Sequence, residues 1–267
     1  MEGKEIVMIT GCSSGIGREL CRVLSARGYT VVATARNIDT LKDLPVSLKL
    51  SLDVTDRESV NGAVEDILQR YGRIDILVNN AGYSVRGAME DIPLQSIKGM
   101  FDVNVFGMVN LIQAVAPVMR GNGYGKIINI GSISGKFTQP INGAYCASKH
   151  AVEAISDALR YELHPHHVQV TVIEPGPIQT NFFRTMDSQS EKWMSNPASV
   201  YEGLYVLDLK RREKQPYTKT EKAAEDICKI IESKQLKSRY EIVVPYAYSM
   251  FARFPYALKD YLMINSH

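Results

Sequence analysis

The stretch Thr10-Gly11-Cys12-Ser13-Ser14-Gly15-Ile16-Gly17-Arg18 follows an apolar run and leads directly into a helical pattern. Its three glycines permit a tight turn, close approach of the backbone to a phosphate and close packing of a helix on a strand. The N-terminus of the following helix offers free N–H groups and the positive end of its dipole to a pyrophosphate. A strand, a glycine-rich loop and a helix at the start of an α/β chain therefore predict a dinucleotide site.

Beyond this stretch, short apolar runs of strand type alternate with amphipathic stretches of helical type. Val, Ile and Leu dominate the runs with little polar alternation, as expected for a parallel sheet covered on both faces. We expect a single α/β domain with a three-layer, doubly wound, Rossmann-type sheet of about seven strands. The expected strands are 5–10, 30–34, 47–52, 74–78, 126–130, 168–173 and 241–244, and the expected helices are 15–27, 57–71, 94–120, 145–163 and 220–233.

The alternation breaks once, in a long aromatic-rich segment before the last expected helix. We assign residues 1–245 to a catalytic domain and about 179–219 within it to a substrate flap, because long insertions are commonly functional. A pair of helices packed on the domain is the alternative, and the two are compatible. Residues 246–267 form an aromatic tail that closes the pocket, packs in an interface or touches a membrane surface, packing being the simplest. The large apolar residues of the flap are Phe182, Phe183, Met186, Trp193, Met194, Tyr201, Leu204 and Tyr205.

Composition limits the classes of partner. A formal charge of +2 over 267 residues gives no basic excess for nucleic acid or an acidic membrane, and the run Lys210-Arg211-Arg212 is interpreted as a solvated face. The four cysteines lack the spacing of a metal or disulfide framework, which favours reduced thiols. We expect no transmembrane segment and no secretion signal, and hence a cytoplasmic location.

The pair Tyr145 and Lys149 has the spacing that places two side chains on one face of a helix. A free tyrosine has a pKa of roughly 10, and a cation held close to it lowers that pKa. Ser132 follows an apolar strand, at the end where open α/β sheets bind ligands. We therefore expect the hydroxyls of Ser132 and Tyr145 to meet one substrate oxygen.

Together these motifs resemble the short-chain dehydrogenase/reductase family. The matching segments are T-G-x-x-x-G-x-G at 10–17, Asn79-Asn80-Ala81-Gly82, Ser132, Tyr145-x-x-x-Lys149 and Pro175-Gly176-Pro177-Ile178-Gln179-Thr180, in the family's order. They cover about residues 5 to 180. The string Glu174-Pro175-Gly176-Pro177, together with T-G-C-S-S-G-I-G and A-T-A-R, looks most like the hydroxysteroid and retinol dehydrogenase branch.

The resemblance implies roles for four catalytic residues. Ser132 binds the carbonyl or alcohol oxygen, and Tyr145 exchanges its proton as general acid or base. Lys149 lowers the pKa of Tyr145 and holds the nicotinamide ribose. Asn104 anchors a water and a proton relay to Lys149; the alternative is a buried asparagine satisfied within its own helix.

The resemblance also implies a set of cofactor-binding residues. Asp53 and Val54 would read the adenine ring, Asn80 would line the adenosine ribose, and Ile178 and Thr180 would hold the carboxamide. The full set is Gly11, Ser13, Ser14, Gly15, Ile16, Gly17, Arg36, Asp53, Val54, Asn80, Ala81, Gly82, Tyr145, Lys149, Pro175, Gly176, Ile178 and Thr180.

The end of the second strand indicates which nicotinamide cofactor binds. An acidic residue there would bind the ribose hydroxyls of NAD and repel a 2′-phosphate. This chain has Ala35 followed by Arg36, whose guanidinium can form charge-assisted bonds to a phosphate, with Ser13 as a second donor. The pattern favours NADP(H); a surface arginine without this role is the alternative.

We expect an NADP(H)-dependent oxidoreductase that interconverts a hydrophobic secondary alcohol and a ketone, or an alcohol and an aldehyde. The enzymatic alternative is a 3-oxoacyl thioester reductase, which would need a basic patch near the pocket. The alternative of another class is a non-catalytic NADP-binding sensor or scaffold. We expect no metal site, because the histidines at 164, 166 and 167 lack acidic or cysteine partners. The resemblance implies a homodimer or homotetramer.

Overall fold

The computed structural model describes residues 5–265. Residues 1–4 and 266–267, the outer ends of the catalytic domain and of the aromatic tail, lie outside the described part. Seven parallel strands form one sheet in the order β3-β2-β1-β4-β5-β6-β9, which confirms the predicted fold class. The strands are β1 (Ile6–Ile9), β2 (Thr30–Ala35), β3 (Leu48–Ser51), β4 (Ile76–Asn79), β5 (Gly125–Ile130), β6 (Val168–Pro175) and β9 (Arg239–Ile242). The last strand begins and ends two residues earlier than expected.

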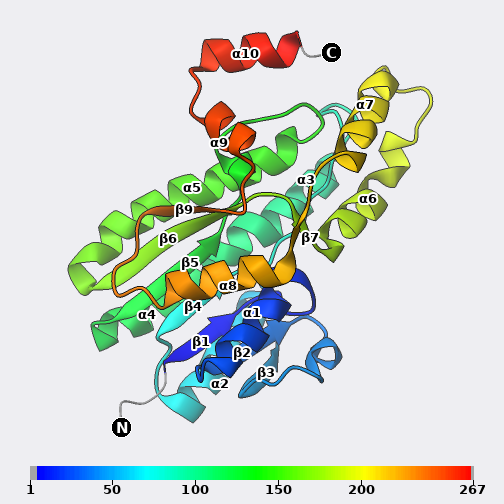
Figure 1. Cartoon of the computed structure of the whole chain (residues 1–267). Helices are drawn as coiled ribbons and strands as arrows, with labels where there is room; N and C mark the ends of the chain where they lie inside the picture. The colour runs from blue at the N-terminus through cyan, green and yellow to red at the C-terminus, as the bar shows by residue number, and fades with distance from the viewer. Residues whose placement is uncertain (1–4, 266–267) are drawn as a thin grey trace.

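Helices cover both faces of the sheet (Figure 1). On one face α1 (Gly15–Ala26) and α8 (Thr220–Ile231) lie side by side and bury an apolar cluster against the strands. On the other face α2 (Arg57–Tyr71), α4 (Met108–Asn122) and α5 (Gly143–Leu163) enclose a second cluster. The central strands β1, β4 and β5 are buried at every residue, which explains their lack of polar alternation, whereas the edge strand β3 is only partly buried.

The strand order reverses between β1 and β4, so the connections after these two strands leave in opposite directions. Such a switch point opens a crevice beyond the carboxyl ends of the strands, where open α/β sheets bind ligands. The glycine-rich loop and the segment that begins at Asn80 both lie at this edge.

The expected long helix at 94–120 is interrupted. It consists of α3 (Leu94–Phe101), a π-helical segment over Asp102–Gly107 and α4. By length and composition alone the stretch 94–122 is the one helix within residues 5–265 that could cross a membrane. Here it packs in the domain, and Leu111, Val115 and Met119 are buried in the core.

The aromatic-rich insertion forms two helices, α6 (Asn181–Met194) and α7 (Glu202–Glu213). A short parallel pair, β7 (Ile178–Gln179) and β8 (Thr218–Lys219), closes the insertion at its base. The chain ends in α9 (Tyr246–Ala252) and α10 (Tyr256–Ile264), and Figure 1 shows α10 standing away from the sheet. Large side chains of α10 are exposed, including Tyr256 and Ile264.

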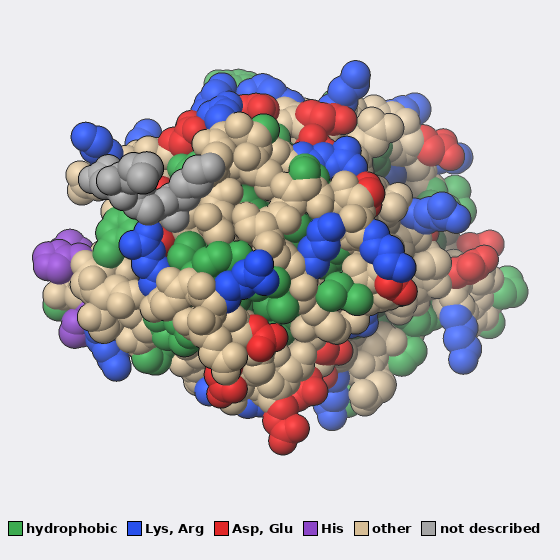
Figure 2. Space-filling model, turned by 90° about the horizontal axis from the view of Figure 1, so that it is seen from below, with side chains coloured by type: hydrophobic (Ala, Val, Ile, Leu, Met, Phe, Trp, Pro, Cys, Tyr) green, Lys and Arg blue, Asp and Glu red, His purple; other side chains and the backbone are tan. Residues whose placement is uncertain are grey.

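Charge on the surface is mixed. Figure 2 shows basic and acidic side chains interspersed over the face seen from below, with histidines gathered at one edge. Within residues 5–265 no group of three or more His, Cys, Asp and Glu side chains could hold a metal ion. The four cysteines are free and buried.

Candidate active site

A cavity of about 580 Å³ lies along the carboxyl edge of the sheet. Its wall begins at the glycine-rich loop after β1, passes the ends of β4 and β5, and continues to the insertion and α9. The size is within the range of ligand pockets in proteins. Segments far apart in the sequence therefore share one cavity.

The glycine-rich loop is shaped for close approach. Gly11 and Gly15 have φ of 71° and 61°, a backbone conformation that side chains disfavour. A Cβ on Gly17 would lie 2.4 Å from the side-chain amide of Asn80, so a larger residue would displace that side chain. Ser14 precedes α1 but its side chain caps no backbone N–H in the described chain. The first turn of α1 thus offers N–H donors to an anion, and the loop fits a dinucleotide phosphate.

The segment after β4 is tied to this loop. Thr10 Oγ1 accepts hydrogen bonds from the backbone N–H of Asn80 and of Ala81, each at 3.0 Å, and Asn80 Nδ2 donates to Thr10 O at 2.8 Å. Asn80, Ala81 and Gly82 line the cavity beside the loop. The structure therefore places these three residues beside the glycine-rich loop, as the sequence predicted.

The end of β2 forms another part of the cavity wall. Ala35 is buried, Arg36 is exposed, and both line the cavity with Ser13. Asp53 and Val54 lie nearby on the wall. Burial raises the pKa of Asp53, but hydrogen bonds from Thr55 and the charge of Arg36 outweigh burial and hold it below its usual value.

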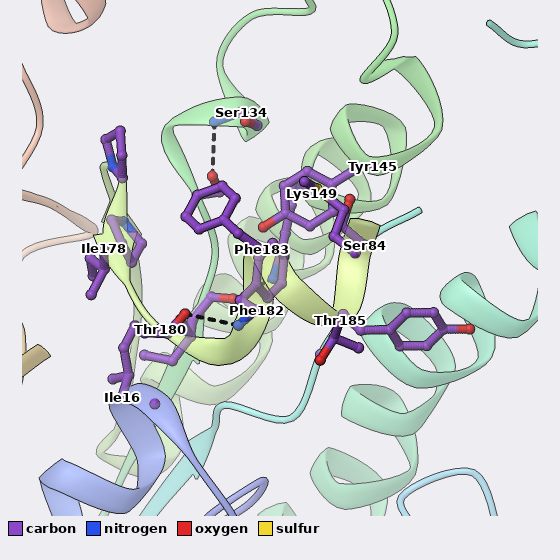
Figure 3. A pocket seen from close by; sticks show the side chains of 18 of the residues that line it. Ile16, Ser84, Ser134, Tyr145, Lys149, Ile178, Thr180, Phe182, Phe183 and Thr185 are labelled. Atoms are coloured by element: carbon purple, nitrogen blue, oxygen red, sulfur yellow. Dashed lines mark hydrogen bonds between the residues drawn. The ribbon is translucent and has the colours of Figure 1, made fainter. Parts of the chain in front are cut away.

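Ser132 and Tyr145 lie next to each other on the cavity wall. Ser132 follows β5 and its Oγ accepts from Ser134 N at 3.1 Å, while Tyr145 lies in the first turn of α5 (Figure 3). Burial raises the pKa of the Tyr145 phenol above its ordinary value, and a hydrogen bond with Ser132 lowers it only in part. The net shift of this pKa is upward because desolvation dominates, and the expectation that the charge of Lys149 lowers it stays a prediction.

Lys149 lies one turn along α5 and is buried. Its Nζ is 5.7 Å from the centre of the Tyr145 ring and donates to Ile130 O at 2.8 Å. Burial lowers the pKa of Lys149 to about 8, against the opposing charge of Glu153. An ammonium with this pKa exchanges protons near neutral pH.

Asn104 lies in the π-helical segment and is buried. Its Oδ1 accepts from Tyr83 N at 2.9 Å, and its Nδ2 donates to Tyr83 O and to Ser148 Oγ. These partners belong to other elements, so the alternative of an asparagine satisfied within its own helix is wrong. A small cavity of about 10 Å³ lies between Asn104 and Lys149, close to the room that one water needs.

The segment after β6 completes the predicted set. Pro175, Gly176, Ile178 and Thr180 line the cavity opposite the glycine-rich loop. A Cβ on Gly15 would lie 3.4 Å from the Thr180 side chain. Thr180 Oγ1 accepts from Phe182 N at 3.2 Å and so caps α6, as Figure 3 shows.

Apolar rings line the cavity next to Tyr145. The Tyr145 ring packs edge-on against Phe182 with centroids 5.7 Å apart, and Phe182 packs against Phe183 at 5.8 Å. Phe137, which the sequence did not reveal, packs against Tyr248 of α9 on the same cavity. The insertion is thus a pair of helices that also line the cavity, α6 with its N-terminal half and α7 with its C-terminal half.

Charged residues that sequence reasoning missed lie at the far end of the cavity. Arg86 pairs with Asp208 at 2.5 Å, and Arg212 pairs with Asp187 at 2.7 Å. The interpretation of 210–212 as a solvated face holds for exposed Lys210 and is wrong for Arg212, which is half-buried on the cavity wall. The basic run itself was the signal in the sequence, whereas Arg86 pairs with Asp208 from more than a hundred residues away, so no local pattern connects them.

An open parallel sheet, a glycine-rich loop at its switch point and a Ser, Tyr and Lys at one cavity define a nucleotide-binding oxidoreductase. The model of the short chain dehydrogenase family matches residues 5–191. The chain belongs to this family, as the motifs predicted.

Similar proteins support the assignment along the whole chain. The chain is 37% identical over 265 residues to 3-ketodihydrosphingosine reductase of Bacteroides thetaiotaomicron, covering 97% of this chain and 95% of that protein. The structure of a short-chain dehydrogenase from Streptomyces avermitilis has a TM-score of 0.80 at 32% identity, covering 94% of this chain and 92% of the other. A short-chain dehydrogenase from Burkholderia cenocepacia in complex with NADP has a TM-score of 0.77 at 25% identity, covering 97% and 98%.

Proposed function

We propose that this protein is an NADP(H)-dependent oxidoreductase that interconverts a hydrophobic secondary alcohol and a ketone, with Tyr145 as the general acid or base. The observation that carries the proposal is the meeting of Ser132, Tyr145 and Lys149 at a cavity that also contains the glycine-rich loop and two phenylalanine rings. The non-catalytic sensor is disfavoured, because these three side chains are all present and share the cavity.

In the proposed mechanism, the glycine-rich loop, Arg36 and Thr180 would hold a reduced nicotinamide cofactor, which would supply the hydride for reduction of the carbonyl. Ser132 donates a hydrogen bond to the carbonyl oxygen, and Tyr145 delivers its proton to that oxygen to give the alcohol. The raised pKa keeps Tyr145 protonated at neutral pH, which suits reduction. Lys149, with a pKa of about 8, returns a proton toward Tyr145, and a water held by Asn104 would connect Lys149 to solvent.

The preference for NADP is supported by the end of β2. Ala35 leaves no carboxylate to bind ribose hydroxyls, and Arg36 and Ser13 share the cavity wall there. Ala35→Asp should shift the ratio of kcat/KM for NADPH over NADH by at least about tenfold toward NADH, because a carboxylate repels a 2′-phosphate. Steady-state rates with both cofactors measure the ratio. An unchanged ratio would show that this position does not select the cofactor.

The substrate is proposed from the apolar rings beside Tyr145, which suit a hydrophobic ketone. A relative named 3-ketodihydrosphingosine reductase makes a ketone on a long alkyl chain a further candidate. The proposal is tested by a panel of apolar ketones, aldehydes and 3-ketodihydrosphingosine with NADPH and NADH, following absorbance of the reduced cofactor. Cofactor binding without turnover of any compound would overturn the enzymatic proposal in favour of the sensor.

A 3-oxoacyl thioester reductase is the second candidate. The sequence showed no basic patch near the pocket, which disfavoured this activity. In the structure, the end of the cavity away from the glycine-rich loop is lined by Arg86, Arg211 and Arg212. Acetoacetyl-CoA therefore belongs in the panel. Its turnover above that of simple ketones would favour this candidate.

A further inference from the structure

The far end of the cavity holds three buried polar atoms without a hydrogen-bond partner in the described chain: Arg86 Nε, Asp208 Oδ2 and Arg212 Nε. All three residues line the cavity. A buried donor or acceptor left unpaired costs about 1–3 kcal/mol. The three atoms themselves are enclosed by protein, so a ligand in the cavity reaches these residues only through their other side-chain atoms.

Arg86 is held in place before any ligand arrives. Only 7% of the residue is exposed. Its backbone N–H donates to Ser190 Oγ at 2.8 Å, and its carbonyl accepts from Trp193 Nε1 at 2.6 Å, so two residues of α6 fix it. Asp208 Oδ1 accepts a hydrogen bond from Arg86 Nη2 at 2.5 Å, whereas the enclosed Arg86 Nε has no hydrogen-bond partner in the described chain.

The charge at this end favours an anion. Arg86, Arg211 and Arg212 contribute three positive charges, whereas Asp208 and Asp187 contribute two negative charges, which leaves one positive charge in excess. An ammonium group would meet three guanidinium groups. Guanidinium groups bind carboxylate and phosphate well through charge-assisted hydrogen bonds.

A path of aromatic rings joins this end to Tyr145. Phe182 contacts Tyr145, Phe183 contacts Phe182, and the Arg212 guanidinium lies 5.6 Å from the Phe183 ring centre. A substrate that lies along these rings has its ketone near Tyr145 and its other end among the arginines.

We propose that Arg86, Arg211 and Arg212 form a subsite for an acidic group, so that the substrate is an apolar ketone that carries a carboxylate or a phosphate at a distance from the carbonyl. This inference rests on the proposed function for the identity of the reacting group, and on the cavity itself for the acidic end.

Binding to the NADP-loaded protein tests the subsite without requiring turnover. The probes are medium-chain oxo acids with the ketone at several distances from the carboxylate, their methyl esters and the matching oxo-alkyl phosphates, measured by calorimetry. We expect the best oxo acid or phosphate to bind at least about tenfold more tightly than its uncharged counterpart, as charged hydrogen bonds predict. Comparison of the acid with the phosphate decides which anion the subsite takes.

Two variants on neighbouring positions of α7 provide the control. Arg211→Gln removes a cation from the cavity wall and should reduce the ratio of acid to ester affinity several-fold. Lys210→Gln removes an exposed cation that does not line the cavity and should leave the ratio unchanged. The double variant Arg86→Gln with Asp208→Asn removes the buried pair together, so no charge is left unpaired, and should also lower the ratio.

Equal affinity for acids, phosphates and esters would overturn the subsite, and so would tighter binding of an amine-bearing ketone. Failure of the proposed function looks different. If oxo acids bind with the expected preference but are not reduced by NADPH, the subsite stands and the ketone chemistry is wrong. If the methyl esters are reduced but the acids bind no better, the chemistry stands and the subsite is wrong.

Discussion

Tyr145 is the residue on which the proposed chemistry depends. Its phenol shares the cavity with Ser132, and Lys149 Nζ lies 5.7 Å from its ring centre. A buried phenol with a raised pKa is a poor base at neutral pH but a competent acid when a basic oxygen forms beside it. The geometry therefore favours reduction of a carbonyl over oxidation of an alcohol near neutrality.

Tyr145→Phe removes the exchanging proton and keeps the ring against Phe182. We expect kcat to fall by about 10²- to 10⁴-fold, the usual contribution of general acid catalysis, while the Kd for NADPH stays nearly the same. Steady-state kinetics and a fluorescence titration measure the two quantities. The control is Tyr161→Phe, because Tyr161 lies on the same helix and is 73% exposed. Retained turnover in Tyr145→Phe would contradict the mechanism.

At the scale of elements, α6 contributes the apolar wall of the reaction end. Phe182→Ala removes the ring that packs on Tyr145. We expect KM for an apolar ketone to rise by about 10- to 100-fold, from the loss of about 1.5–3 kcal/mol of apolar burial. Affinity for NADPH should change little, because the phosphate loop lies on α1. Val200→Ala, at an exposed position of the same insertion, is the control. A parallel loss of both affinities would instead make α6 a structural support.

A buried charged cluster joins α5 to β6 and β9 behind Lys149. Glu153 is 8% exposed and accepts from Arg239 Nε at 2.8 Å. Burial, with the nearby charge of Glu174, raises the pKa of Glu153 to about 7. A carboxyl whose pKa is raised by folding stabilises the fold when protonated, and this contribution is lost as pH rises through about 7.

Glu153→Gln should therefore gain stability relative to the natural protein as pH rises from 5 to 8. The free energy of unfolding of the variant should rise by about 3 kcal/mol relative to that of the natural protein. The pKa of Glu153 is about 7 in the fold against an ordinary value of 4.5, and each pKa unit corresponds to about 1.4 kcal/mol. Urea unfolding at several pH values measures it. The control is Glu162→Gln, at an exposed position of α5, whose free energy of unfolding should vary with pH as that of the natural protein does. If the free energy of unfolding of Glu153→Gln shows the same pH dependence as the natural protein, Glu153 is ionised in the fold at neutral pH and the prediction is wrong.

The sequence predicted elements whose signal is local. The strands β2, β1, β4, β5 and β6 are mainly apolar, and the glycine-rich loop contains the glycines that its turn needs, so both could be predicted from neighbouring residues. The edge strand β9 contains Arg239 and Glu241, and its predicted bounds were two residues too late. The π-helical segment at 102–107 could not, because no residue pattern in it distinguishes a π-helical turn from an α-helical one, and the chain continues through Gly107 into α4. The ion pair of Arg86 and Asp208 joins two segments that meet only after the insertion folds back on the domain, so no local pattern reveals it.

At the scale of the whole molecule, one cavity gathers residues from both halves of the sheet. Gly11 and Arg36 come from the first half, Tyr145 and Thr180 from the second, and the insertion adds its own wall. A ligand that spans this cavity contacts both halves of the sheet and the insertion at once. The homodimer or homotetramer and the cytoplasmic location stay predictions.

Cofactor binding should therefore stabilise the entire domain against unfolding. At a concentration of 100 times its Kd, NADPH adds about 2.7 kcal/mol to the free energy of unfolding. For a domain of this size that corresponds to a rise of roughly 5–10 °C in Tm. Differential scanning calorimetry with NADPH and with NADH at the same concentration measures both shifts. The shift with NADPH should be the larger, and Arg36→Gln should lower it toward that of NADH. Equal shifts in the natural protein would show that the end of β2 does not bind the 2′-phosphate.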